Sequence, residues 1–135
     1  MIEFDKEVIR IINFVENLTN ANIKDCIIKN NTIYLLVDKK TKFSLYNIAM
    51  LKILKRLLNK EIKVYEYSSD LNEFLRNLIP YMISYRILNN NGKKIIEIKV
   101  NKMYKGLVLG RNKRNLEVYK SLLSRNFKIN DVKII

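Results

Sequence analysis

The chain has 135 residues, and 48% of them are hydrophobic, which is enough for a packed core and too much for a disordered chain. Its 26 Lys and Arg residues outnumber 13 Asp and Glu residues, giving a formal net charge of +13. The sequence contains no histidine, so Ser–His and Cys–His nucleophilic sites and most zinc sites are excluded. We therefore expect a nucleic-acid-binding protein rather than an enzyme, with no cofactor and no metal site.

The sequence also predicts the cellular compartment of the protein. A single cysteine, Cys26, cannot form an internal disulfide, which suits a reducing cytosol. The first residues lack a signal-peptide pattern, and no apolar run is long enough to span a bilayer. We expect a cytoplasmic protein with no membrane contact and no small-molecule substrate. The sequence also lacks a nucleotide-binding signature, which favours a nucleic-acid backbone as the bound phosphate.

Residue patterns in the first half alternate between helical and strand periods. The predicted elements are, in order, a helix over 5–19, strands over 23–28 and 32–37, one broken or two short helices within 44–59, and a strand over 61–67. Asp5 is a suitable N-cap for the first helix. The Asn30-Asn31 pair tolerates left-handed backbone and predicts a hairpin between the first two strands.

The second half repeats this order. Its predicted elements are a helix from Asp70 to Pro80, strands over 82–88 and 94–100, the segment 106–110, a helix over 115–125 and a strand over 132–135. Asp70 and Glu73 form a capping box, and the only proline, Pro80, ends the helix. Asn91-Gly92 is the strongest turn signal in the chain.

Each half therefore reads helix, strand, strand, helix, helix, strand. Asn47 and Asn112 occupy matching places, and Leu57-Leu58 matches Leu122-Leu123 at the same offset. Only Ser68-Ser69 separates the halves, which is too short for a free linker. We predict an α+β fold with two rigidly joined units, residues 1–68 and 69–135.

Basic residues are concentrated at matching places in the two halves. No acid lies between Asp38 and Glu61, nor between Glu97 and Glu117. These windows hold the basic residues Lys39, Lys40, Lys42, Lys52, Lys55, Arg56 and Lys60, and Lys99, Lys102, Lys105, Arg111, Lys113 and Arg114. Because both windows cover the same element of the repeat, they predict a continuous basic strip that binds a strand of phosphates.

The stretch from Lys105 to Asn115 carries the most specific signal. Gly106 and Gly110 are two of only three glycines in the chain. A glycine at position 110 allows a sharp turn and close approach to a ligand. The basic loop that follows opens a helix, where backbone N–H groups and the helix dipole favour an anion.

This αββααβ order with a glycine loop between the middle helices resembles the type II KH domain, and the whole chain resembles the archaeal NusA-like family of two tandem KH domains. The motifs that carry the resemblance are Lys24-Asp25-Cys26, Val64-Tyr-Glu-Tyr-Ser68 and Gly106-Leu-Val-Leu-Gly-Arg-Asn112. It implies three-stranded sheets packed on helices, and single-stranded RNA held by a Gly-x-x-Gly loop that clamps about four nucleotides per module. It also implies transcription elongation or termination beside RNA polymerase.

Carried over to this sequence, the second unit's loop is Gly110-Arg111-Asn112-Lys113, with Lys113 where the second glycine belongs. That lysine either crowds the RNA backbone or adds a direct charge to it. The first unit's loop, Leu45-Tyr46-Asn47-Ile48, lacks both glycines. The expected RNA-binding residues are Gly110, Arg111, Asn112, Lys113, Arg114, Lys105, Gly106 and Leu109, with a secondary basic track of Lys40, Lys42, Tyr46, Asn47 and Lys52.

Further residues have two interpretations. Val108 and Leu109 either line a base-binding groove or pack in the core, and Tyr104 and Tyr119 either stack on bases or are structural. The function also has alternatives. A divergent KH pair could serve as a protein-interaction module on the polymerase with weak or no RNA binding, or it could act in ribosome assembly.

Overall fold

The computed structural model describes residues 5–38 and 48–135. The chain divides between Ser69 and Asp70 into two compact units, called here the first and the second unit. Both contain helices and a three-stranded sheet, so the predicted α+β class is confirmed. The identification of each unit as a KH domain and the rigid connection between them stay predictions.

Short-range signals explain the elements of the first unit. These are α1 (Lys6–Thr19), β1 (Ile23–Lys29), β2 (Thr32–Val37), α2 (Ile48–Leu58) and β3 (Glu61–Glu66). The Asp5 carboxylate accepts a hydrogen bond from the Val8 N–H at 2.8 Å and caps α1. Asn30 and Asn31 have φ angles of 50° and 62° and reverse the chain between β1 and β2. The predicted helix and hairpin are thereby confirmed.

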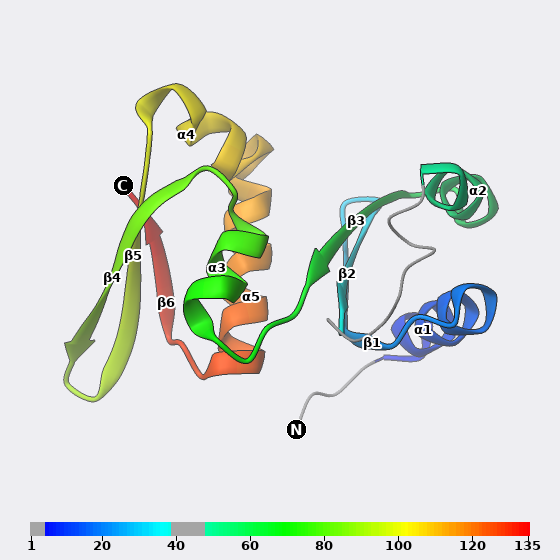
Figure 1. The fold of residues 1–135 in the computed structure, drawn as a ribbon, viewed down its shortest axis with the longest axis horizontal. Helices are drawn as coiled ribbons and strands as arrows, with labels where there is room; N and C mark the ends of the chain where they lie inside the picture. The colour runs from blue at the N-terminus through cyan, green and yellow to red at the C-terminus, as the bar shows by residue number, and fades with distance from the viewer. Residues whose placement is uncertain (1–4, 39–47) are drawn as a thin grey trace. The chain divides into compact units, whose positions relative to one another are not determined.

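The sheet of the first unit has the order β1-β2-β3. Strand β2 is antiparallel to β1 and parallel to β3, with Thr32 opposite Glu61. Helices α1 and α2 lie on the same side of this sheet (Figure 1). Val15 of α1, Leu54 of α2 and Leu35 of β2 are fully buried in the core.

The second unit contains one more helix than the structure describes in the first. Its elements are α3 (Leu71–Leu78), β4 (Met82–Asn90), β5 (Lys93–Val100), α4 (Lys102–Leu109), the 3₁₀ turn η1 (Arg111–Lys113), α5 (Arg114–Phe127) and β6 (Asp131–Ile134). The Asp70 carboxylate accepts from the Glu73 N–H at 3.1 Å, as the capping box predicted. Asn91 and Gly92 have φ angles of 53° and 82°, so the strands continue up to a tight turn and are longer than predicted.

The second sheet repeats the topology of the first. Its order is β4-β5-β6, with β4 antiparallel and β6 parallel to β5. Helices α3 and α5 cover one face of this sheet (Figure 1). The rings of Phe74 and Phe127 lie 5.0 Å apart between these helices, and Ile96 and Ile98 of β5 are fully buried. Strand β6 lies at the edge of this sheet, beside β5, and shares a groove with Leu109 at the end of α4.

The predicted register between the last helices of the two halves stays a prediction. Leu57 is 58% exposed, whereas its predicted counterpart Leu122 is 1% exposed, so this pair differs in burial. Leu54 and Tyr119, which stand at the same offset, are both buried. Burial therefore agrees at one pair and differs at the other.

Most of the first unit's predicted RNA track cannot be placed. Lys40, Lys42, Tyr46 and Asn47 lie outside the described residues. Lys52 lies on α2 and is exposed. The continuous basic strip across both halves therefore stays a prediction.

Two further properties concern the described ranges alone. No helix in them combines the length and apolarity needed to cross a membrane. They also contain no group of three or more His, Cys, Asp or Glu side chains placed to hold a metal ion. Cys26 is buried in the core of the first unit, as a small apolar residue would be.

Candidate nucleic-acid interface

The turn between α4 and α5 depends on Gly110. Its φ and ψ of 76° and 171° belong to a region open almost only to glycine. The Gly110 N–H donates to the Gly106 carbonyl at 3.0 Å, and the Lys113 N–H donates to the Gly110 carbonyl at 3.1 Å. The glycine therefore ends α4 and starts the 3₁₀ turn that leads into α5.

Asn115 packs directly on this glycine. A Cβ atom built on Gly110 would lie 2.8 Å from both Cγ and Nδ2 of Asn115. The same amide group donates a hydrogen bond to the Leu107 carbonyl at 3.4 Å. Asn115 thus links the first turn of α5 to the last turn of α4. Sequence reasoning missed this role because the contact exists only once the turn is formed.

Lys113 has the backbone conformation that glycine would favour. Its φ is 58°, and the preceding Asn112 has a φ of 55°. Asparagine visits this left-handed region readily, whereas lysine adopts it at a cost of about 1 kcal/mol. The loop therefore keeps its turn without a second glycine, and a cationic side chain stands there instead.

The start of α5 is suited to an anion. Lys113 occupies the N-cap position and makes no side-chain capping hydrogen bond. Arg111 and Asn112 are exposed beside it. The Nε atom of Arg114 is enclosed and has no hydrogen-bond partner among the described residues. Since helix N-termini attract negative charge, a phosphate at this turn would meet both the helix dipole and these cationic side chains.

A groove of about 440 Å³ runs beside this turn. It is lined by Lys105 and Leu109 of α4, Lys113 of η1, Leu116 and Lys120 of α5, Asp131, Val132, Lys133 and Ile134 of β6, and Ile135. Five of the ten lining residues are apolar, and four of the other five are lysines. Such a surface can contact bases through its apolar residues and phosphates through its lysines.

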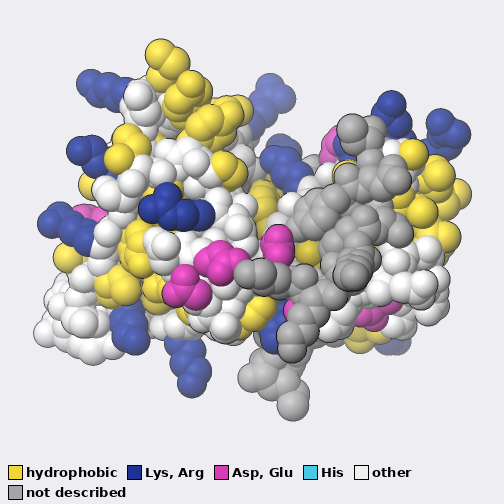
Figure 2. Space-filling model, viewed as in Figure 1, with side chains coloured by type: hydrophobic (Ala, Val, Ile, Leu, Met, Phe, Trp, Pro, Cys, Tyr) yellow, Lys and Arg dark blue, Asp and Glu magenta, His cyan; other side chains and the backbone are white. Residues whose placement is uncertain are grey.

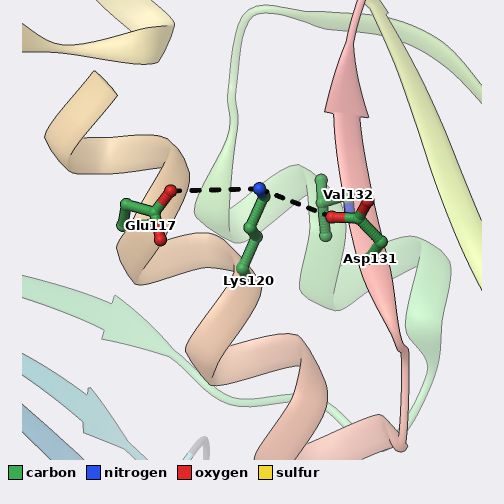
Figure 3. A network of polar contacts seen from close by, with 4 residues as sticks. All are labelled: Glu117, Lys120, Asp131 and Val132. Carbon is green, nitrogen blue, oxygen red and sulfur yellow. Dashed lines mark hydrogen bonds and ion pairs between the residues drawn. The ribbon is translucent and has the colours of Figure 1, made fainter. Parts of the chain in front are cut away.

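One of the four groove lysines, Lys120, forms ion pairs with acidic side chains. Figure 3 shows Lys120 of α5 between Glu117 of the same helix and Asp131 of β6. The Lys120 Nζ lies 3.9 Å from the Glu117 carboxylate and 3.4 Å from that of Asp131, which also accepts from the Val132 N–H at 2.8 Å. The three remaining lysines, Lys105, Lys113 and Lys133, form no ion pair with a described residue. The groove therefore keeps a net positive charge.

The structure brings together part of the predicted site. Lys105, Leu109 and Lys113 line the groove, with Gly110 between them in the chain. Val108 does not line it and is buried in the core. Gly106 is exposed on α4. Of the two tyrosines considered for base stacking, Tyr119 is buried and Tyr104 is exposed.

Several groove residues were not anticipated from the sequence. They are Leu116, Lys120, Asp131, Val132, Lys133, Ile134 and Ile135. Most of them come from β6, which pairs in parallel with β5 at the sheet edge. A clue was present in the alternation of Val132, Lys133 and Ile134, which predicts a strand but not its neighbour.

Gly106 lies within α4, where neither packing nor backbone geometry requires glycine. A Cβ atom built there meets nothing within 4 Å. We expect Gly106→Ala to raise the free energy of unfolding by about 0.5–1 kcal/mol, because alanine loses less backbone entropy in a helix. Urea unfolding followed by circular dichroism measures this.

Gly92→Ala provides the matched control for this change. Gly92 also has open space around its missing Cβ, but its φ of 82° strains an L-residue. The same chemical change should therefore be destabilising at Gly92. A loss of stability at Gly106 as well would contradict the exposed helical position of that residue.

Comparisons with known proteins agree with the resemblance found in the sequence. No family model matches the chain. It is 26% identical over 138 residues to the probable transcription termination protein NusA of Methanocaldococcus jannaschii, a match that covers 99% of this chain and 75% of that protein. The protein of the same name from Thermoplasma acidophilum is 26% identical over 141 residues, with 98% and 95% covered.

A solved structure agrees as well. The chain in the crystal structure of APE1850 has 29% sequence identity to this one, and the two structures match with a TM-score of 0.77. The match covers 98% of this chain and 100% of that one. The predicted resemblance is therefore confirmed, and the chain is similar over nearly its whole length to two archaeal proteins named as probable transcription termination protein NusA.

Proposed function

We propose that this chain binds single-stranded RNA and acts in transcription elongation or termination beside RNA polymerase. The observation that carries the RNA part is the groove beside the α4–α5 turn, whose lining combines four lysines with five apolar residues. The names of the two archaeal relatives support the transcription part. No catalytic step belongs to this proposal.

In the proposed mode of binding, the turn holds the RNA backbone and the groove receives the bases. Gly110 makes room for Asn115 and forms the turn that presents the first turn of α5 to a phosphate, where Arg111 and Arg114 add charge. Lys113 continues this charge into the groove. Leu109 and the other apolar residues of the groove contact base faces. Because backbone contacts carry no sequence information, we expect modest base preference.

Fluorescence anisotropy with a labelled single-stranded RNA decamer tests the proposal. We expect the logarithm of the association constant to fall linearly with the logarithm of the salt concentration, with a slope of about −0.7 per phosphate neutralised. A basic protein without an RNA site, matched in net charge, is the control. Affinity no greater than that of the control would contradict RNA binding.

That negative result would favour a protein-interaction module instead. Lys113 at the second glycine position and the missing glycines of the first unit's loop are the features that support this alternative. Co-purification with polymerase subunits, as opposed to ribosomal particles, separates the transcription role from a role in ribosome assembly.

A further inference from the structure

Helix α4 has a second exposed face that the groove does not use. Successive helical residues are separated by about 100°, so Met103, Tyr104 and Leu107 lie on one side and Lys105 and Leu109 on the opposite side. Met103 is 79% and Leu107 61% exposed. Figure 2 shows hydrophobic side chains gathered over α4. We call Met103, Tyr104 and Leu107 the outer face of α4.

An exposed pair of stacked aromatic rings lies at this outer face. The ring centroids of Tyr81 and Tyr104 are 4.5 Å apart, and their planes are inclined by 20°. Tyr81 is 43% and Tyr104 37% exposed, although the two rings cover part of each other. A planar aromatic surface of this kind accepts a base on a ring face that remains open.

Helix α4 carries charge that favours a polyanion on its groove side. No acid occurs in the sequence between Glu97 and Glu117, Lys105 lines the groove, and helical spacing puts Lys102 near the same side. Gly106 lies on the helix surface between the groove side and the outer face, and it presents no side chain. A strand that leaves the groove could therefore cross α4 at Gly106 without meeting a side chain there.

We infer that Tyr104 and Tyr81 form a stacking platform for an unpaired base of the RNA strand held in the groove. This inference rests on the proposed function and extends it, because the platform lies on the opposite side of α4 from the groove. It predicts that a longer RNA gains affinity by stacking one base on the tyrosine pair.

Anisotropy titrations with an RNA tetramer and an RNA decamer test the platform. Tyr104→Leu and Tyr81→Leu keep apolar bulk but remove the planar ring. We expect each to weaken decamer binding by about 5- to 100-fold, as removal of one stacked base would. Tetramer binding should be unchanged, because about four nucleotides fill the loop and groove. Tyr104→Phe, which retains the ring, is the matched control and should bind as the parent does.

Further outcomes distinguish the inference from its alternatives. If the parent binds both RNAs and Tyr104→Leu changes neither affinity, the platform is wrong and the proposed function stands. If Met103→Ala and Leu107→Ala weaken decamer binding as much as Tyr104→Leu, the face acts by general apolar contact and stacking is overturned. If the parent binds neither RNA, both proposals fall, and the outer face of α4 becomes a protein-docking surface.

Discussion

Gly110→Ala is expected to lower the free energy of unfolding of the second unit by about 2–4 kcal/mol. An L-residue is strained at the φ and ψ of 76° and 171° that Gly110 adopts. The added Cβ would also lie 2.8 Å from the amide group of Asn115. Chemical denaturation followed by circular dichroism measures the change, and the Gly106→Ala variant four residues earlier should change stability in the opposite direction.

A second substitution separates the two causes of this loss. In Gly110→Ala/Asn115→Ala the clash with the Asn115 amide group is removed, while the 3.1 Å contact with the backbone nitrogen of residue 115 and the backbone strain remain. The Gly110→Ala change should then lower the free energy of unfolding less in the Asn115→Ala background than in the parent chain. A Gly110→Ala variant as stable as the parent would show that the turn does not have the geometry described above.

Lys113→Glu/Lys133→Glu is expected to weaken RNA binding by at least about tenfold at low salt, because acids then face the strand from both walls of the groove. The slope of log K against log salt should become shallower by about 0.7 for each phosphate that the variant no longer neutralises. Neither lysine forms an ion pair with a described residue, so the fold should be retained. Anisotropy titration of the decamer across a salt series measures both quantities.

The matched control for this variant is Lys93→Glu/Lys94→Glu, which makes the same change in net charge. Both lysines are exposed at the start of β5, at the end of the sheet away from α4 (Figure 1). This control should lose far less affinity than the groove variant. Equal losses would mean that RNA responds to net charge alone and that the groove is not the binding site.

The local elements follow from short stretches of sequence. Asp5 and Asp70 cap helices through hydrogen bonds that reach three residues along the chain. Asn30-Asn31 and Asn91-Gly92 reverse the chain because these residues accept positive φ angles. Each of these signals acts within a few residues, so it can be interpreted without knowing what packs against it.

Relations between distant segments were predicted less well. The apolar pattern of a helix recurs at every turn, so it does not by itself fix how the two halves align. The predicted pair of Leu57 and Leu122 differs in burial, since Leu57 is exposed and Leu122 is buried. Val108 and Leu109 each had two interpretations, although only Leu109 was among the expected RNA-binding residues. Their different placement around α4 puts Val108 in the core and Leu109 in the groove.

From its residue pattern, then, the chain could be identified as a basic α+β protein whose glycine loop leads into a helix. The composition of the groove depends on packing that no local pattern encodes. Lys113 and Lys133 line the same groove because β6 pairs in parallel with β5 and lies beside α5. Likewise, Tyr104 meets Tyr81 because α4 packs near the start of β4. Strand pairing and helix packing join segments far apart in the sequence, and the free energy that selects these partners belongs to the assembled core.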